Sequence, residues 1–379
     1  MKNFYSKYPV LISVTLILIF TISIIGGYTY LYEKIANSLF FRDALCGSKS
    51  GPAQGNFKKV ISFHGLTMGT TYKIKYVRGN ALKSVKNIQN AVDTSLEKIN
   101  SIMSTWDANS DLSRINKAPA DKWLKLNPDL SALIGFAFDL SKKTNGKYDV
   151  AIGPLINIWG FGPRGEKKIP NQWQIKKAMQ ISGYEKIDLN IKENKLKKRF
   201  KASYIDLSSI AKGYGVDKIA ELLENFGIKN YMVEIGGEIK TCGQKIDIPW
   251  RIAIESPRKK KNKIFNKVLN LNDCAMATSG DYRNFFKHGK IRYSHTIDPA
   301  TGHPVENDLA SVTVVIPNGE CYKADAWATA LMVSGKDKGF ELAAKFKIPA
   351  HFIYIKNDKL QEISTKRFTT LVYDRTAKL

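Results

Sequence analysis

The feature that most constrains the fold of this chain is an uncharged apolar run at residues 10–32, VLISVTLILIFTISIIGGYTYLY. At about 1.5 Å rise per residue, a helix of this length crosses a hydrocarbon core of roughly 30 Å. A secretory signal peptide has an apolar core of only about 7–15 residues and a small-residue cleavage site, and neither fits. The run therefore predicts an uncleaved transmembrane anchor at residues 9–32, after a short cytoplasmic N-terminus at residues 1–8.

Charges on the two sides of this run set the expected orientation. Lys2 and Lys7 precede it, while Lys34 and Arg42 follow it, so the positive-inside bias is slight. We expect the N-terminus in the cytoplasm, the anchor in the inner membrane and the body facing the periplasm.

The segment after the run is typical of a tether. The stretch DALCG (43–47) is similar to a lipoprotein cleavage site with Cys46 as the lipidated residue, although Asp43 stands where an apolar residue belongs. Whether Cys46 is lipidated or the anchor is kept stays open at this point. Glycine, serine and proline in the stretch CGSKSGPAQGN predict a linker at residues 33–56.

The chain is strongly basic, with 59 Lys+Arg against 34 Asp+Glu and a net charge of +25. Such a charge favours anionic partners. Much of it lies in the runs KLKKRFK (195–201) and RKKKNK (258–263), which are typical of solvated hairpin tips. No nucleic-acid motif accompanies these runs, so we expect no nucleic-acid partner.

The cysteines argue against a zinc site. The four of them, Cys46, Cys242, Cys274 and Cys321, include no C-x-x-C pair and no histidine at ligand spacing. In an oxidising compartment two of them could form a disulfide, but spacing leaves the pairing open.

Residues 57–379 predict a single compact body of the α+β class, because strands and helices mix without a strict βαβ order. The β-rich halves of 58–77 flank Gly69 and predict a hairpin. Apolar periodicity or helix-end signals predict helices at 81–103, 128–146, about 216–226 and 322–335. A strand and then a turn are expected within 204–210, and further strands at 231–235, 250–255, 311–316 and 351–355.

One apparent dinucleotide motif is rejected. GFGPRG (160–165) matches G-x-G-x-x-G, but Pro163 lies inside it and no amphipathic helix follows. Without a helix N-terminus at that point, nothing would hold a pyrophosphate.

The stretch ADAWATAL (324–331) is a candidate cation site. Asp325 and Thr329 stand four residues apart on a predicted helix, so they share a face. A carboxylate and a hydroxyl are ligands that Mg²⁺ accepts. The alternative is an aspartate that only interacts with the helix dipole in the first turn.

Two more polar stretches carry candidate groups. IDLSSIAKGYG (205–215) places an acid, a hydroxyl and a cation at a strand-to-helix turn, where a helix N-terminus favours phosphate. The alternative to a phosphate site here is a plain capping turn, with Ser208 or Ser209 as the N-cap. In MSTWDANSDLSRIN (103–116), Trp106 lies in a polar loop and suits stacking on a flat ligand, or plain packing.

Taken in order, the motifs of residues 60–360 resemble those of the FAD:protein FMN transferases, the ApbE family. These motifs are TMGTTY (67–72), MSTW and SDLSRIN (103–116), YDVAIGPLINIWGFG (148–162), IDLSSIAKGYGVD (205–217), ATSGDYRNFF and SHTIDPATGHPV (277–305), and ADAWATAL (324–331).

The resemblance implies a fold of the ApbE type, and an enzyme that cleaves FAD and links FMN through its phosphate to a Thr or Ser of a target flavoprotein. The usual targets belong to membrane redox complexes. By resemblance, FAD would contact Met68, Trp106, Lys147, Tyr148, Asp149, Asp206, Lys212 and Ile297. Mg²⁺ would be held by Ser209, Asp325, the carbonyl of Ala328 and Thr329.

Two positions depart from a close match. Some relatives have Asp where this chain has Ala328, which leaves a site of lower charge and predicts weaker metal binding. Lys147 matches the family only by its position.

The loop YSHTIDPATGHP (293–304) carries the expected general base. Pro299 and Pro304 stiffen it, because proline fixes φ. A neutral imidazole suits removal of a hydroxyl proton near pH 7, which makes His295 the candidate, with Asp298 as the fallback. The other histidines, His64, His288, His303 and His351, are interpreted as surface or packing residues.

Two other functions stay open on the sequence. One is a Mg²⁺-dependent FAD pyrophosphatase that forms FMN and AMP without a protein acceptor. The other is a membrane protein that binds FAD without chemistry.

Overall fold

The computed structural model describes residues 59–79, 84–163, 165–260, 263–280, 285–289 and 291–372. They belong to one unit, Lys58–Leu379. The predicted anchor at 9–32 and linker at 33–56 lie outside these residues, as does Cys46. Within the described ranges, no helix has the length and apolarity needed to span a membrane.

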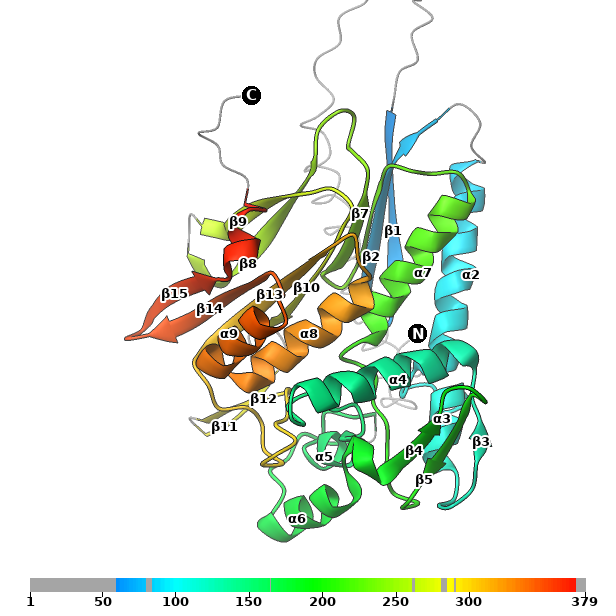
Figure 1. The fold of residues 1–379 in the computed structure, drawn as a ribbon, viewed down its shortest axis with the longest axis vertical. Coiled ribbons are helices and arrows are strands. Elements are labelled where there is room, and N and C mark those ends of the chain that lie inside the picture. The colour runs from blue at the N-terminus through cyan, green and yellow to red at the C-terminus, as the bar shows by residue number, and fades with distance from the viewer. Residues whose placement is uncertain are drawn as a thin grey trace, which may run out of the picture. The chain divides into compact units, whose positions relative to one another are not determined.

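An antiparallel sheet of eight strands is the centre of this unit (Figure 1). Each neighbouring pair in it is antiparallel. In sheet order, the strands are β1 (Lys59–Thr67), β2 (Thr70–Arg78), β6 (Tyr231–Ile235), β7 (Glu238–Cys242), β10 (Cys274–Gly280), β13 (Leu309–Pro317), β14 (Ala350–Lys356) and β15 (Lys359–Ser364).

Helices cover one face of this sheet. In Figure 1, α2 (Val85–Met103), α7 (Ala211–Asn225) and α8 (Cys321–Ser334) lie in front of the strands, and α9 (Lys336–Lys345) lies beside α8. An antiparallel sheet with helices gathered on one face is an α+β architecture. The predicted fold class is therefore confirmed.

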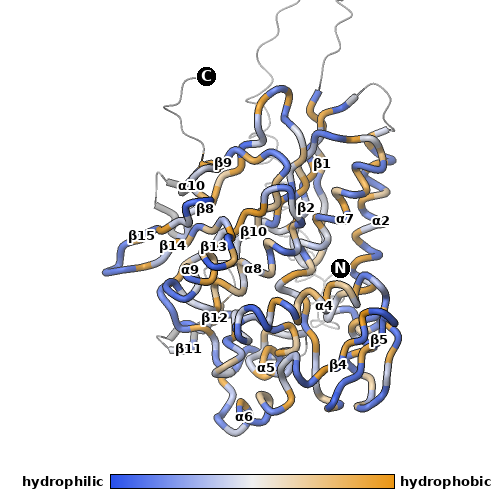
Figure 2. Tube along the Cα trace, in the orientation of Figure 1, coloured by the Kyte–Doolittle hydropathy of each residue, from blue (hydrophilic) through white to orange (hydrophobic). Residues whose placement is uncertain are grey.

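Successive side chains of a strand point to opposite faces of the sheet, so each face has its own apolar core. On β6, Val233 and Ile235 pack towards α2 and α7, whereas Met232 points to the opposite face. There it meets Trp250 and Leu269 of the two-stranded ribbon formed by β8 (Trp250–Lys260) and β9 (Lys263–Leu271). Figure 2 shows the contrast between apolar central strands and the hydrophilic tip of β14–β15.

A second group of elements lies below the sheet in Figure 1. It consists of α3 (Asp111–Lys117), α4 (Pro128–Lys143), α5 (Gly153–Ile158), α6 (Gln172–Ile181), the 3₁₀ turn η2 (Tyr184–Lys186) and the small sheet of β3 (Leu124–Lys125), β5 (Lys195–Lys198) and β4 (Ile187–Asn190). The remaining elements are the hairpin β11 (Phe285–His288) and β12 (Ile291–Ser294), and α10 (Lys366–Thr369).

Most of the predicted elements are present. The hairpin at 58–77 is β1–β2, the helix at 128–146 is α4, and the helix at 322–335 is α8. No helix begins directly after GFGPRG, since α6 starts at Gln172, which supports the rejection of that motif.

Two local predictions are wrong. Residues 203–207 do not join a sheet, because their backbone groups bond elsewhere: Asp206 N–H donates to Val150 O, and Ile205 N–H donates to Asn116 Oδ1. Neither Ser208 nor Ser209 caps α7, whose N-cap is Ile210 with no side-chain hydrogen bond.

The cysteines that the structure describes are free thiols: Cys242, Cys274 and Cys321. Burial raises the pKa of Cys242 and of Cys274 to about 11. These two thiols are therefore protonated near neutral pH and unreactive.

Candidate functional site

The site is built around the N-terminus of α7. The first N–H groups of a helix have no partner within the helix. Here Asp325 is the partner of one of these groups, because its Oδ2 accepts a hydrogen bond from Gly213 N–H at 3.0 Å. Asp325 lies in the second turn of α8, so its interpretation as a first-turn dipole residue of its own helix is wrong.

Glycine at position 213 permits this arrangement. A Cβ there would lie 2.5 Å from Cys321 O and 2.6 Å from Tyr322 Cα. The backbones of α7 and α8 therefore meet without a side chain between them, which brings the α7 N-terminus within reach of Asp325.

Two buried carboxyl groups flank one lysine. Lys212 Nζ lies 3.7 Å from Asp325 Oδ1 and 3.3 Å from Glu238 Oε1. Both acids are 3% exposed. Burial raises the pKa of Asp325 and of Glu238, and Lys212 opposes both shifts. Burial by itself lowers the pKa of Lys212, but Asp325 and Glu238 outweigh it and raise that pKa, so the lysine is charged.

The hydroxyl groups of two predicted metal ligands, Ser209 and Thr329, make hydrogen bonds to neighbouring side chains. Ser209 Oγ donates to the buried Tyr148 hydroxyl at 3.1 Å. Thr329 Oγ1 and Ser279 Oγ share a hydrogen bond of 3.1 Å. Burial raises the pKa of Tyr148, with further rises from Asp325 and other acids nearby, so this phenol keeps its proton.

The donor atoms fit a hard cation such as Mg²⁺. Among the described residues there is no group of three or more His, Cys, Asp and Glu able to hold a metal. Asp325, Ser209 and Thr329 offer oxygen only, which Mg²⁺ prefers. Ala328 is fully buried within α8. Its carbonyl accepts a hydrogen bond within the helix, so at most one lone pair of this oxygen remains for a metal ion.

Two predicted FAD residues lie at exposed or turn positions. Met68 occupies the β1–β2 turn with a φ of +49°, and a Cβ on Gly215 would come 3.0 Å from its Cε. Met68 therefore covers the first turns of α7. Trp106 lies between α2 and α3 and is 70% exposed, which leaves its indole face available for stacking.

The acids Asp149 and Asp206 are engaged in local turns. Both oxygens of Asp149 accept backbone N–H groups, from Ala151 at 2.7 Å and Tyr184 at 2.8 Å. Burial raises the pKa of Asp149 to about 6. Asp206 Oδ1 accepts from Ser208 N–H at 2.8 Å, and burial raises its pKa. Their contacts with FAD stay predictions.

The loop at 293–304 is a closed turn. Asp298 N–H donates to His303 O, and Gly302 N–H donates to Asp298 O, each at 2.8 Å. Ile297 is 3% exposed and packs with Trp159. Its side chain is part of this core, so only its backbone remains for a ligand.

His295 lies half-buried in this loop, with its ring edge-on to Phe161 at 6.4 Å between centroids. Lys147 ties the loop to the segment after α4 by an ion pair of 2.7 Å with Asp298 Oδ2. The next residue, Tyr148, bonds Ser209 at the start of α7. Residues 147 and 148 therefore connect the loop of His295 to the α7 site.

The other histidines are surface or packing residues, as predicted. His64 and His288 are exposed, and His303 lies edge-on to Trp159. His351 is fully buried and stacks on Phe368, with ring centroids 5.1 Å apart.

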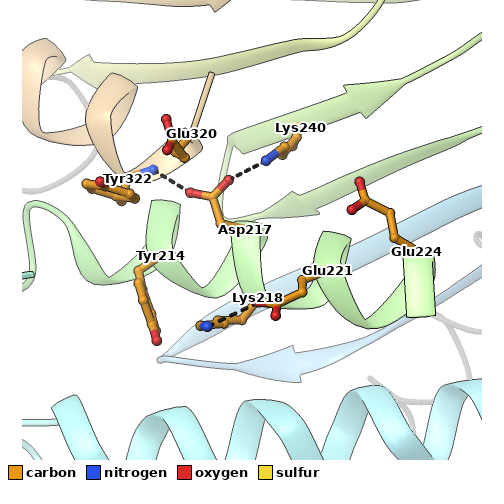
Figure 3. A pocket seen from close by; sticks show the side chains of 8 residues that line it. All are labelled: Tyr214, Asp217, Lys218, Glu221, Glu224, Lys240, Glu320 and Tyr322. Carbon is orange, nitrogen blue, oxygen red and sulfur yellow. Dashed lines mark hydrogen bonds and ion pairs between the residues drawn. The ribbon is translucent and has the colours of Figure 1, made fainter. Parts of the chain in front are cut away.

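A cavity of about 260 Å³ lies beside the site but contains none of the predicted residues (Figure 3). Asp217 is at its centre, accepts the N–H groups of Cys321 and Tyr322, and pairs with Lys240. This acid therefore caps α8. The acids of its lining outnumber Lys218 and Lys240, which leaves a negative charge unsuited to a diphosphate; these acids are Asp217, Glu221, Glu224 and Glu320.

Sequence reasoning missed Glu238. A single acid after a Gly-Gly pair has no periodicity or spacing to mark it, and its burial arises only when β7 pairs with β6 and β10.

Comparisons with known proteins show the family of this chain. The family model of the ApbE family matches residues 68–352. This chain belongs to the ApbE family. It is 41% identical over 310 residues to a FAD:protein FMN transferase of Vibrio cholerae, covering 81% of this chain and 91% of that protein. A FAD:protein FMN transferase of Haemophilus influenzae is 39% identical over 319 residues, which cover 83% of this chain and 92% of that protein.

Solved ApbE structures share the fold. The flavin transferase ApbE of Vibrio cholerae has a TM-score of 0.77 at 38% identity, covering 83% of this chain and 99% of its own. The apo flavinyl transferase ApbE of Pseudomonas stutzeri has a TM-score of 0.76 at 37% identity, covering 83% and 97%. The resemblance in the motifs and the expectation of a transferase enzyme of this family are confirmed.

Proposed function

We propose that this protein cleaves FAD and attaches the FMN moiety to a Thr or Ser hydroxyl of a target flavoprotein, releasing AMP in a Mg²⁺-dependent reaction. Membership of the ApbE family supports the flavin chemistry. The observation that carries the proposal is the convergence of Asp325 and Lys212 at the N-terminus of α7. An anion-favouring helix end, a lysine and an oxygen-donor cation site suit a diphosphate.

The proposed reaction is a nucleophilic substitution at phosphorus. The acceptor hydroxyl oxygen bonds to the phosphorus of the FMN half, and the bond from that phosphorus to the bridging oxygen breaks, so AMP leaves with that oxygen. The hydroxyl proton goes to the His295 imidazole, on the loop that Lys147 and Asp298 hold. Lys212 offsets negative charge on the phosphates.

Mg²⁺, when bound by Asp325, Ser209 and Thr329, would neutralise further charge on the diphosphate oxygens. The replacement of a family Asp by Ala328 predicts a higher Mg²⁺ requirement than in relatives with that Asp.

The experiment mixes the full chain in detergent with FAD, Mg²⁺ and a candidate acceptor flavoprotein from a membrane redox complex. A fluorescent acceptor band on a denaturing gel, with AMP in the supernatant, supports transfer. AMP with free FMN and no labelled acceptor would instead identify a pyrophosphatase. FAD retained without AMP release would identify a binding protein.

We also propose that the protein is held in the inner membrane by residues 9–32, with its body facing the periplasm. The support for the anchor is the uncharged run, and the orientation is our assignment, since Lys2 and Lys7 before the run are balanced by Lys34 and Arg42 after it. The full chain should fractionate with membranes and be digested by protease added to spheroplasts. A mature N-terminus at Cys46, or anywhere after residue 32, would contradict the anchor.

A further inference from the structure

Glu238 is a buried carboxyl group at the centre of the site. It is the first residue of β7 and follows the turn at Gly236 and Gly237, whose φ angles are +63° and +111°. Its Oε1 faces Lys212 Nζ at 3.3 Å. Its Oε2 has no hydrogen-bond partner among the described residues.

A carboxyl group in this environment does not stabilise the fold by itself. Moving it out of water costs free energy that a single ion pair in the interior offsets only partly. The unpaired oxygen adds to this cost. An apolar side chain of similar volume would pack here at lower cost, so Glu238 needs an explanation in the chemistry of the site.

Lys212 is the group that Glu238 touches, and Lys212 lies between two carboxyl groups. Its Nζ is 3.3 Å from Glu238 Oε1 and 3.7 Å from Asp325 Oδ1. The turn before β7 supports the lysine stem, because a Cβ on Gly236 would come 3.3 Å from Lys212 Cδ. The lysine side chain is 29% exposed, so its ammonium can meet a ligand that enters the site.

Removal of Glu238 would change what Lys212 does. Among the ion pairs that the structure describes, Asp325 would then be the remaining partner of the ammonium. An ammonium and a metal ion compete for the same carboxylate oxygens, since both are cations that bind at close range. Glu238 reduces this competition because it offers the ammonium a second partner.

We propose that Glu238 is a positioning residue, which holds the Lys212 ammonium off Asp325 so that Asp325 can ligate a divalent cation while Lys212 faces a substrate phosphate. The identity of that substrate rests on the proposed function. The effect on the affinity for the cation does not depend on it.

The test is Mg²⁺ binding to the full chain in detergent without FAD, measured by isothermal titration calorimetry. Glu238→Met should weaken Mg²⁺ binding about tenfold, within the usual range for coupled neighbouring groups. Lys212→Met should bind Mg²⁺ at least as tightly as the wild type. The double variant should match Lys212→Met, because the competing ammonium is gone.

A structural role for Glu238 would not produce this pattern. If the double variant bound Mg²⁺ as weakly as Glu238→Met, or if Glu238→Met bound it normally, the proposal would be overturned. Glu234→Met, on the neighbouring strand β6, is the matched control and should leave the affinity unchanged. Circular dichroism checks folding, and Glu238→Gln replaces Glu238→Met should the latter unfold, with a smaller weakening expected.

The two proposals fail separately. If the variants show this pattern of Mg²⁺ binding but the wild-type chain transfers no flavin, the proposed function is refuted and the role of Glu238 is supported. A chain that transfers flavin while its Glu238 variants bind Mg²⁺ normally would do the reverse.

Discussion

Lys147 Nζ lies 2.7 Å from Asp298 Oδ2, and this ion pair joins the segment after α4 to the loop that carries His295. The two side chains are 28% and 15% exposed, so the pair is partly shielded from solvent. It gives Lys147 a defined structural partner at a position where the family resemblance implies a flavin contact.

Breaking this pair should loosen the loop. Lys147→Met and Asp298→Asn should each lower the transfer rate several-fold, and the double variant should lose little more than either one, with a coupling of about 1 kcal/mol. The rates come from in-gel flavin fluorescence. The exposed Lys143→Met is the control. Weaker FAD binding in Lys147→Met but not in Asp298→Asn would show that Lys147 also contacts FAD.

Replacement of His295 tests the general base. His295→Asn should still bind FAD, while the transfer rate falls by about 10²–10⁴-fold, the usual contribution of a positioned acid or base. His303→Asn, in the same loop, should have little effect. An equal loss of FAD affinity and rate in His295→Asn would make the histidine a binding residue, and Asp298 would become the candidate base.

Asp325 has two separable roles. Asp325→Ala should abolish transfer and also lower the free energy of unfolding by about 1–3 kcal/mol, because Gly213 N–H loses its acceptor. Asp325→Asn retains a carbonyl oxygen and should lose transfer with a smaller loss of stability. Thr329→Val should raise the Mg²⁺ requirement less severely. Full activity of Asp325→Ala at low Mg²⁺ would leave the residue with only its capping role.

Gly213 should not tolerate a side chain. A Cβ at 2.5 Å from Cys321 O must push α7 away from α8, so Gly213→Ala should destabilise by about 1–3 kcal/mol, as overpacked sites do. Urea unfolding measures the change. Gly79→Ala is a suitable control, because a Cβ there meets nothing within 4 Å. Equal stability of the two variants would contradict the close contact.

His351 should make stability depend on pH. Burial lowers its pKa to about 4, although Glu362 opposes the shift. The unfolded chain, with a pKa near 6.5, binds the proton more readily, so stability falls as pH drops from about 6.5 to 4, by up to about 3 kcal/mol. Asp149, whose pKa is raised, contributes with the opposite sign.

The contribution of His351 is isolated by subtraction. Urea unfolding of the wild type and of His351→Gln, compared at pH 7 and pH 5, should show a smaller loss on acidification in the variant. The same loss in both chains would mean that other groups carry the pH dependence.

Local chemistry in the chain was enough to predict much of the fold. Pro128 and Gly146 bracket α4, Gly227 follows α7, and Gly335 ends α8, because proline at a helix start and glycine after its end act within a few residues. Alternating β-branched and aromatic residues marked β6 at its observed bounds. The order of polar motifs was enough to predict the family.

Long-range contacts decided the rest. Ser208 and Ser209 had suitable chemistry for a cap, yet the α7 N-terminus is capped by Asp325, more than a hundred residues later in the chain. Residues 204–207 resembled a strand, but the N–H groups of Ile205 and Asp206 donate to Asn116 of α3 and to Val150 rather than to a sheet. Glu238 became a member of the site through burial and through Lys212, neither of which leaves a mark on neighbouring residues. Such features depend on which elements meet in space, and local propensity does not encode that.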